Sequence, residues 1–264
     1  MKVSIEEIAT LERVNYEANW TIAQITPGLE ICLRDDVVFT SSEVFPSPDM
    51  NHACLLQATA ETVDELIIAI INYFSAKELP PTIFVSPACT PPDLPQRLAD
   101  QGFESGDKEA WMTLDNLSER DLPLLNPKVL VKQITRSEVM TFASTFMAGF
   151  EMPLELAPSM AYVIEPSVGL PSVSHYLAYI DGLPVGTYSL ICHKYYGIIG
   201  SASVVPAFRR KKAARNLTIA AIKTAQQQGV NTLMLQTTAG FLLERLLSIY
   251  GFRKVFTRIA YTLS

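Results

Sequence analysis

Residues 204–214 read V-V-P-A-F-R-R-K-K-A-A, and this stretch joins an apolar predicted strand to a long Ala-rich predicted helix over residues 210–228. Four consecutive cations stand at the start of that helix: Arg209, Arg210, Lys211 and Lys212. The N-terminus of a helix presents N–H groups without acceptors and a partial positive charge, so it favours anions. The stretch therefore predicts a binding site for a polyanion.

The composition indicates a globular protein. The chain has 264 residues, of which 48% are hydrophobic and 18% charged, so it can form one large domain or two of ordinary size. The longest apolar run, residues 66–71, is far shorter than the ~20 residues that span a bilayer. Acids stand near the N-terminus, where a signal peptide needs an apolar run, and the four cysteines are widely scattered. We expect reduced thiols, a cytoplasmic location and no membrane partner.

The charge is distributed unevenly along the chain. Residues 1–127 carry 21 Asp and Glu against 7 Lys and Arg, a net charge of −14. Residues 128–264 carry 6 Asp and Glu against 14 Lys and Arg, a net charge of +8. Opposite signs favour two domains with different roles, with chance placement of solubilising charges as the alternative. A single short cationic run in a chain with a pI near 5.2 argues against a nucleic-acid partner.

The same order of predicted elements occurs twice: strand, helix, strand, helix, Gly-Phe and strand. The first copy comprises residues 52–57, 62–76, 82–85, 94–100 and 110–114, and the second comprises 196–205, 210–228, 232–236, 240–249 and 255–263. Residues 117–128, with two prolines and alternating charges, are the predicted linker. An Asp-Gly pair at 181–182 predicts a hairpin between two strands of the second half.

The second half resembles the GNAT superfamily of acyl-CoA-dependent N-acetyltransferases, whose motif runs V-x-P-x-x-R/Q-x-x-G-x-G/A. Val204, Pro206, Arg209 and Ala214 match this motif, and Gly251-Phe252 before the last strand matches the family's usual ending. The resemblance implies an α/β (α+β) chain of two GNAT-like domains, each a mixed, mostly antiparallel sheet flanked by helices. A degenerate GNAT-like domain is expected over residues 1–120 and the N-acetyltransferase domain over residues 128–264.

The resemblance also implies a donor, an acceptor and a binding site. The expected donor is acetyl-CoA, with no metal, and the acceptor is the primary amine of a small molecule or peptide. The backbone of the loop would hold the pyrophosphate; its residues are Arg209, Arg210, Lys211, Lys212, Ala213 and Ala214. The pantetheine would lie between residues 201–205 and 232–236 and pair with Val204 and Val205. A backbone N–H of the first of these strands would stabilise the oxyanion.

Two positions depart from the family pattern. Lys212 stands where the first loop glycine is expected, and its ammonium could contact phosphate directly. Leu247 stands where the family has a tyrosine that acts as the general acid, and Tyr250, three residues further, is a partial substitute. The alternatives to an active enzyme are therefore an inactive acyl-CoA-binding or regulatory module, or an interaction scaffold without a ligand.

Other ionisable residues are candidates for the general base. Glu151, Glu155 and Glu165 lie on the segment expected to cover the acceptor side, although exposed loop acids are common there. The histidines, His52, His175 and His193, are too separated for a metal site and are expected at the surface or at strand ends, with His193 as a possible proton acceptor. The absence of G-x-S-x-G, P-loop and H-E-x-x-H motifs argues against serine hydrolases, P-loop NTPases and zincins.

Overall fold

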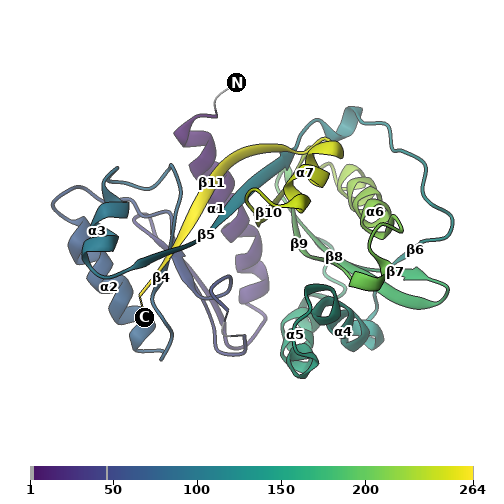
Figure 1. The fold of residues 1–264 in the computed structure, drawn as a ribbon, viewed down its shortest axis with the longest axis horizontal. Coiled ribbons are helices and arrows are strands. Elements are labelled where there is room, and N and C mark those ends of the chain that lie inside the picture. Colours follow the sequence, from purple (N-terminus) through teal and green to yellow (C-terminus); the bar gives the residue numbers. More distant parts are fainter. Residues whose placement is uncertain (1–2, 46, 264) are drawn as a thin grey trace. The chain divides into compact units, whose positions relative to one another are not determined.

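The computed structural model describes residues 3–45 and 47–263, which form two compact units with a mixed α/β fold (Figure 1). The first unit contains the chain up to Thr113 and again from Gln236 onward, and the second contains Leu114–Leu235. This division differs from the predicted domains, 1–120 and 128–264. The first segment of this unit ends at Thr113, where the prediction has 120, and the last 29 residues also belong to the first unit.

Within the first unit, neighbouring strands follow the order β1-β2-β3-β4-β11-β5. Its strands are β1 (Leu29–Leu33), β2 (Val38–Ser42), β3 (His52–Cys54), β4 (Thr82–Val85), β5 (Glu104–Leu114) and β11 (Arg253–Thr262). Its helices are α1 (Ile5–Ala23), α2 (Val63–Ser75), α3 (Leu94–Asp100) and α7 (Leu242–Ile249). Strands β3 and β4 are parallel, and the other neighbouring pairs are antiparallel.

The position of β11 explains why the C-terminal residues belong to the first unit. This strand lies between β4 and β5 and pairs with both: Tyr261 lies opposite Ile83, and Phe256 lies opposite Trp111. The rings of Trp111 and Phe256 stack with their centroids 5.0 Å apart. The C-terminal strand therefore completes the sheet of the N-terminal half.

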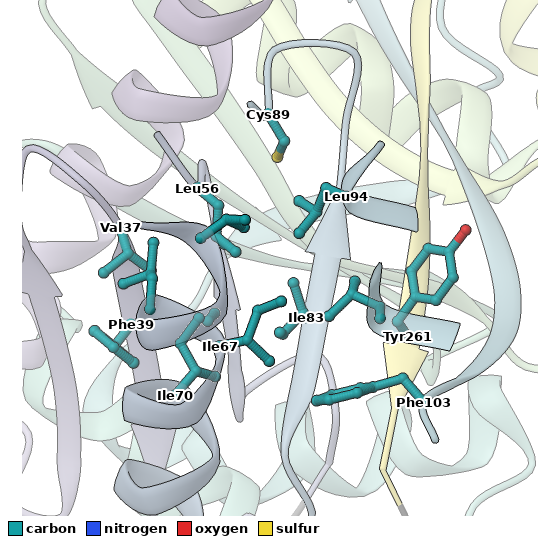
Figure 2. Packing of buried hydrophobic residues seen from close by; sticks show 14 of the residues in the cluster. Val37, Phe39, Leu56, Ile67, Ile70, Ile83, Cys89, Leu94, Phe103 and Tyr261 are labelled. Atoms are coloured by element: carbon teal, nitrogen blue, oxygen red, sulfur yellow. The ribbon is translucent and has the colours of Figure 1, made fainter. Parts of the chain in front are cut away.

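Helices α2 and α3 cover the apolar core of the first unit (Figure 2). The spacing of the apolar residues on α2 predicted one buried face, and Val63, Ile67, Ile70 and Phe74 are fully buried on it. The core residues that these helices meet come from the strands and loops: Val37, Phe39, Ala53, Leu56, Ile83, Cys89, Phe103 and Tyr261.

A cluster of ionisable side chains is also buried in the first unit. Arg258, which is 4% exposed, pairs with Glu109 and lies 3.6 Å from a carboxylate oxygen of Glu12, which is fully buried. Its Nη1 donates a 2.7 Å hydrogen bond to the Tyr16 hydroxyl, which is 2.6 Å from Nε2 of His52. The face of the Phe84 ring lies 4.1 Å from the guanidinium carbon. The arginine is thus surrounded by acceptors and aromatic rings, as a buried cation requires.

The second unit has a sheet with the strand order β10-β9-β8-β7-β6. Its strands are β6 (Leu130–Gln133), β7 (Val173–Ile180), β8 (Leu183–His193), β9 (Tyr196–Val204) and β10 (Thr232–Thr238, which continues past the unit at Leu235). Its helices are α4 (Val139–Phe150), α5 (Ala157–Ile164) and α6 (Ala213–Gln227). Helices α4 and α5 lie on one face of the sheet and α6 on the other (Figure 1).

Two local predictions for the second unit have different outcomes. The Asp181-Gly182 hairpin between β7 and β8 is confirmed, with both residues at positive φ, as a type I′ turn requires. The predicted linker 117–128 is bound to α6, because Gln226 donates hydrogen bonds to the carbonyls of Leu117 and Arg120.

Among the helices of the described residues, none combines the length and the apolar character needed to cross a membrane.

Candidate functional site

The loop between β9 and α6 holds the four predicted cations. After Val204 the chain makes a 3₁₀ turn over Pro206–Phe208, and α6 begins only at Ala213. The predicted start at residue 210 is therefore three residues too early. Arg210 and Lys212 have φ angles of 66° and 69°, and residues in this left-handed region cannot continue a right-handed helix.

Lys212 adopts the backbone conformation that a glycine would favour at this position. Its φ and ψ of 69° and 14° lie in the left-handed region, where a Cβ atom is strained and glycine is not. The family glycine is thus replaced by lysine without a change to a right-handed backbone. The lysine side chain adds a cation to this loop.

The first turn of α6 supplies N–H donors directly after this loop. The helical hydrogen bonds begin with the Asn216 N–H, which donates to the Lys212 carbonyl at 3.1 Å. The preceding N–H groups, those of Ala213, Ala214 and Arg215, have no acceptor within the helix by its geometry. Amide donors and the positive end of the helix dipole therefore adjoin the cationic loop.

Three of the four cations line a pocket of about 370 Å³ within the second unit. The pocket is lined by Arg210, Lys211, Lys212, Lys128, Asn126, Val129, Ile180 and Asp181. Four of these side chains are cationic and one is anionic, so the pocket favours a negatively charged ligand.

Lys128 belongs to this pocket because α6 fixes its segment. Asn216, which is fully buried, accepts a hydrogen bond from the Asn126 N–H and donates to the carbonyls of Asn126 and Val129. A buried amide with its donors and acceptor satisfied holds the backbone firmly. Sequence reasoning missed Lys128, because the three pocket cations that it joins lie more than 80 positions away in the chain.

Arg209, in contrast, contacts the protein itself. Its Nε donates to the Val204 carbonyl at 3.2 Å, and its Nη2 donates to the Gly149 carbonyl at 3.0 Å. The same Nη2 lies 3.4 Å from a carboxylate oxygen of Glu151. The side chain of Arg209 therefore joins the loop to the end of α4.

The end of β9 presents backbone groups at one of its edges. Strand β10 pairs in parallel with Tyr196–Ile198, and β9 continues beyond this pairing to Val204. The Val205 N–H donates to the Val185 carbonyl at 2.9 Å, and the Val205 carbonyl accepts from Phe208, so both groups of Val205 are occupied. Because successive residues of a regular strand face opposite edges, Val204, which precedes Val205, directs its N–H group away from β8. Val205 therefore has no free backbone group for the expected pairing with pantetheine, while the pairing with Val204 stays a prediction.

A β-bulge in β9 produces this arrangement. Thr187 lies opposite Ser203 and Ser189 opposite Gly200, so two residues, Ser201 and Ala202, oppose the single residue Tyr188. Ser201 has a φ of 48°, and its carbonyl accepts a hydrogen bond from the Thr187 hydroxyl at 2.6 Å. Bulges re-aim backbone groups and are common beside functional sites. Sequence reasoning missed this one, since no glycine or proline occupies the bulge.

The predicted acid and base candidates lie in several places. Glu151 pairs with Arg209, while Glu155 and Glu165 are exposed in short 3₁₀ turns before and after α5. His193 is half-buried at the end of β8. Tyr250 is half-buried at the C-terminal end of α7, which belongs to the first unit. Its role as general acid stays a prediction.

The histidines were expected at the surface or at strand ends; His52 begins β3, as expected, but it is buried, and His175 is buried inside β7. His52 is 2% exposed and His175 is 3% exposed, and burial lowers the pKa of His52 to about 3 and that of His175 to about 4. His175 lies between the hydroxyls of Ser167 and Ser189, at 2.8 and 2.7 Å. Both are neutral, hydrogen-bonded core residues. In residues 3–45 and 47–263, no group of His, Cys, Asp and Glu side chains is arranged to hold a metal ion.

Comparisons with known proteins agree with this geometry. The sequence model of the acetyltransferase (GNAT) family matches residues 143–246, which include β9, the cationic loop and α6. No curated protein sequence matches the chain.

Solved structures match over nearly the whole chain. A GCN5-related N-acetyltransferase from Kribbella flavida has a TM-score of 0.71 at 13% identity and covers 96% of this chain and 94% of its own. A tandem GNAT protein from the clavulanic acid biosynthesis pathway has a TM-score of 0.66 at 13% identity. This match covers 98% of the present chain and 94% of the other. A GCN5-related N-acetyltransferase from Sphaerobacter thermophilus has a TM-score of 0.63 at 12% identity, and the match covers 99% of the present chain and 94% of the other. The chain thus has the fold of these solved structures, and its residues 143–246 are similar to the acetyltransferase (GNAT) family.

Proposed function

We propose that the chain transfers an acetyl group from acetyl-CoA to the primary amine of a small molecule or peptide. The loop before α6 supports this most directly, because Lys212 keeps a left-handed backbone where the family has glycine and the first-turn amides of α6 follow it. Coenzyme A carries a pyrophosphate and a ribose phosphate, which need several N–H donors and cations. In this proposal the loop residues 210–214 and the cations of the adjoining pocket bind these phosphates.

The proposed reaction uses the open edge of β9. The pantetheine pairs with the backbone of Val204, and a backbone N–H at this edge stabilises the oxyanion as the amine nitrogen attacks the thioester carbonyl. The carbon–sulfur bond breaks, the amide forms, and the thiolate takes a proton, for which Tyr250 is the proposed donor. The ammonium proton goes to a base, for which Glu151, Glu155, Glu165 and His193 are the candidates.

Calorimetric titration with acetyl-CoA tests the phosphate assignment. Replacing both Arg210 and Lys211 with Gln is expected to weaken binding about tenfold or more, because hydrogen bonds from charged groups are each worth about 1.5–3 kcal/mol. The loss should grow as the salt concentration is lowered. Lys223→Gln, an exposed cation further along α6, is the matched control and should bind like the wild type. Equal affinity of the double variant and the control would show that the assignment is wrong.

A second function is favoured by the residue at the position of the family's general acid. Leu247 has no ionisable group there and is 7% exposed, which fits an inactive acyl-CoA-binding or regulatory module. An assay for released thiol over a panel of amines separates the two. Thiol release that depends on an amine supports the enzyme, binding without release supports the module, and no binding of acetyl-CoA supports a scaffold without a ligand.

We also propose that the protein works in the cytoplasm. All four cysteines are free thiols, and Cys54 and Cys89 are buried. Reduced thiols are typical of proteins from a reducing compartment. Cell fractionation with an antibody against the chain tests this location.

A further inference from the structure

Arg209 differs from the three cations that follow it. Arg210, Lys211 and Lys212 line the pocket, while the guanidinium of Arg209 donates to the carbonyls of Val204 and Gly149 and pairs with Glu151. These three acceptors come from the end of β9 and from the end of α4. Arg209 thus links two segments that lie more than 50 residues apart in the sequence.

The end of α4 is suited to receive this cation. Helix α4 ends at Phe150, and Glu151 follows in the left-handed conformation with a φ of 58°. The N–H of Met152 donates to the Met147 carbonyl at 2.9 Å, which closes the helix end as a Schellman-type turn. The Gly149 carbonyl instead accepts from Arg209, and a cation at a helix C-terminus interacts favourably with the helix dipole.

The same helix end touches β9 directly. A Cβ atom on Gly149 would lie 2.3 Å from Oγ of Ser203 and 3.2 Å from the backbone nitrogen of Val204, so only glycine permits this approach. The N–H of Val204 is one of those assigned to the donor. The guanidinium therefore bridges two backbones that are already in contact, and a shift of the loop must strain or break its hydrogen bonds.

We propose that Arg209 is a positioning residue that couples the donor loop to residues 149–156, which carry the candidate bases Glu151 and Glu155. This inference rests on the proposed function. When phosphate fixes the loop, Arg209 restrains the end of α4, and the acceptor side becomes more ordered before the amine binds. Because coupling between two sites is reciprocal, ordering of residues 149–156 by the acceptor raises the affinity for the donor.

Hydrogen exchange of the Glu151 and Met152 amides, measured with and without saturating coenzyme A, tests the coupling. In the wild type, coenzyme A is expected to slow their exchange about fivefold, the lower end of typical coupling between sites. Arg209→Gln should lose most of this slowing, although its affinity for coenzyme A falls less than about threefold. Arg209→Lys should restore only part of it, since one ammonium cannot bridge the three acceptors.

Two matched variants complete the experiment. Arg210→Gln, at saturating coenzyme A, should keep the slowing at Met152 because the contacts of Arg209 remain. Glu151→Gln should reduce it, because one of the three acceptors becomes neutral. Melting temperatures within about two degrees of the wild type show that the variants are folded, so a change in coupling is not a loss of structure.

The inference is overturned if Arg209→Gln keeps the slowing, and in particular if it also binds coenzyme A as weakly as Arg210→Gln. Arg209 would then be an ordinary phosphate ligand. If the wild type fails to bind coenzyme A, the proposed function is wrong, and exchange without ligand still tests the bridge. In that case Arg209→Gln should speed the exchange of Met152 about threefold or more, and an unchanged rate would reject the bridge as well.

Discussion

The backbone at Lys212 has an energetic cost that its side chain must offset. A residue with a Cβ atom in the left-handed region costs about 1 kcal/mol relative to glycine. The lysine is exposed at the pocket, where its ammonium is available to an anion. The strain at the backbone and the charge at the pocket are thus two separate properties of this residue.

Replacing Lys212 with glycine separates these two effects. Lys212→Gly is expected to stabilise the fold by about 1 kcal/mol relative to Lys212→Ala, because both variants lose the ammonium and only the glycine relieves the strain. Denaturant unfolding of the two variants measures the difference. Equal stabilities, or a less stable glycine variant, would contradict the strain at this position.

Affinity for acetyl-CoA reports on the ammonium of Lys212. If the loop only tolerates the lysine, both variants should bind as well as the wild type. Weaker binding by both shows that the ammonium contacts a phosphate directly.

Glu12 is a buried carboxyl group of the first unit whose pKa lies near neutrality. Burial raises its pKa from 4.5 to about 7, against the opposing effect of Arg258. A carboxyl group with a raised pKa in the folded state stabilises the protein below pH 4.5, and this stabilisation is lost as the pH rises through 7. Relative to Glu12→Gln, the wild type should lose roughly 2 kcal/mol of unfolding free energy between pH 5 and pH 8.

The comparison with Glu12→Gln removes the effect of other groups. The depressed pKa values of His52 and His175 act in the opposite direction below pH 6.5, but both chains contain these histidines. Urea unfolding of both chains at pH 5 and pH 8 measures the difference between their free energies of unfolding. A stability gap that does not change with pH would mean that Glu12 titrates near its ordinary pKa.

At the scale of elements, the packing of α4 on β9 depends on one glycine. The Cβ atom of Gly149→Ala would approach Oγ of Ser203 to 2.3 Å and its Cβ to 2.6 Å, so helix and strand must separate. We expect a loss of about 1–3 kcal/mol, as is typical of overpacking. Gly200→Ala on β9 is the matched control, since nothing lies within 4 Å of its added methyl group. In thermal unfolding, the melting temperature of Gly149→Ala should lie well below that of this control.

Elements governed by local chemistry could be predicted from the sequence. The Asp181-Gly182 hairpin follows from turn residues that accept positive φ, and α2 follows from the spacing of its apolar residues. The start of α6 was placed wrongly because Arg210 and Lys212 have no local preference for the left-handed conformation that they adopt. The bulge at Ser201 depends on the register between β8 and β9, which a single strand does not encode.

In the candidate site too, the parts that are continuous in sequence could be predicted and the tertiary contacts could not. The cationic loop and the α6 amides are consecutive in sequence, so the motif located them. The contacts of Arg209 with Gly149 and the position of Lys128 depend on tertiary structure. The occupied N–H of Val205 could not be known before the pairing partner in β8 was known.

At the scale of the whole molecule, the last strand decides how the chain divides. Repeat order predicted that β11 belongs to the second copy, whereas it pairs with β4 and β5 of the first. Pairing between distant strands is set by tertiary structure and not by local sequence. Counted by unit, residues 114–235 carry 8 acidic and 11 basic residues, a net charge of +3, and the first unit carries −9. The charge contrast is therefore smaller than the division at residue 127 indicated.

Removing residues 253–264 should damage the first unit selectively. The deletion takes away the strand between β4 and β5 and leaves Glu12 and Glu109 without Arg258. Unpaired buried charge and open strand edges are both strongly destabilising. We expect residues 82–85 to lose most of their hydrogen-exchange protection, while the β7–β8 hairpin keeps its own. Retained protection in β4 would show that β11 is dispensable.

The place of β11 also governs how the protein is made. A ribosome releases the strands flanking β11 early, but Arg253 emerges only after residues 114–252 have been synthesised. At typical elongation rates this delay is on the order of ten seconds. During that time the N-terminal half exposes the edges of β4 and β5 and an incomplete apolar layer, which favours aggregation of the nascent chain.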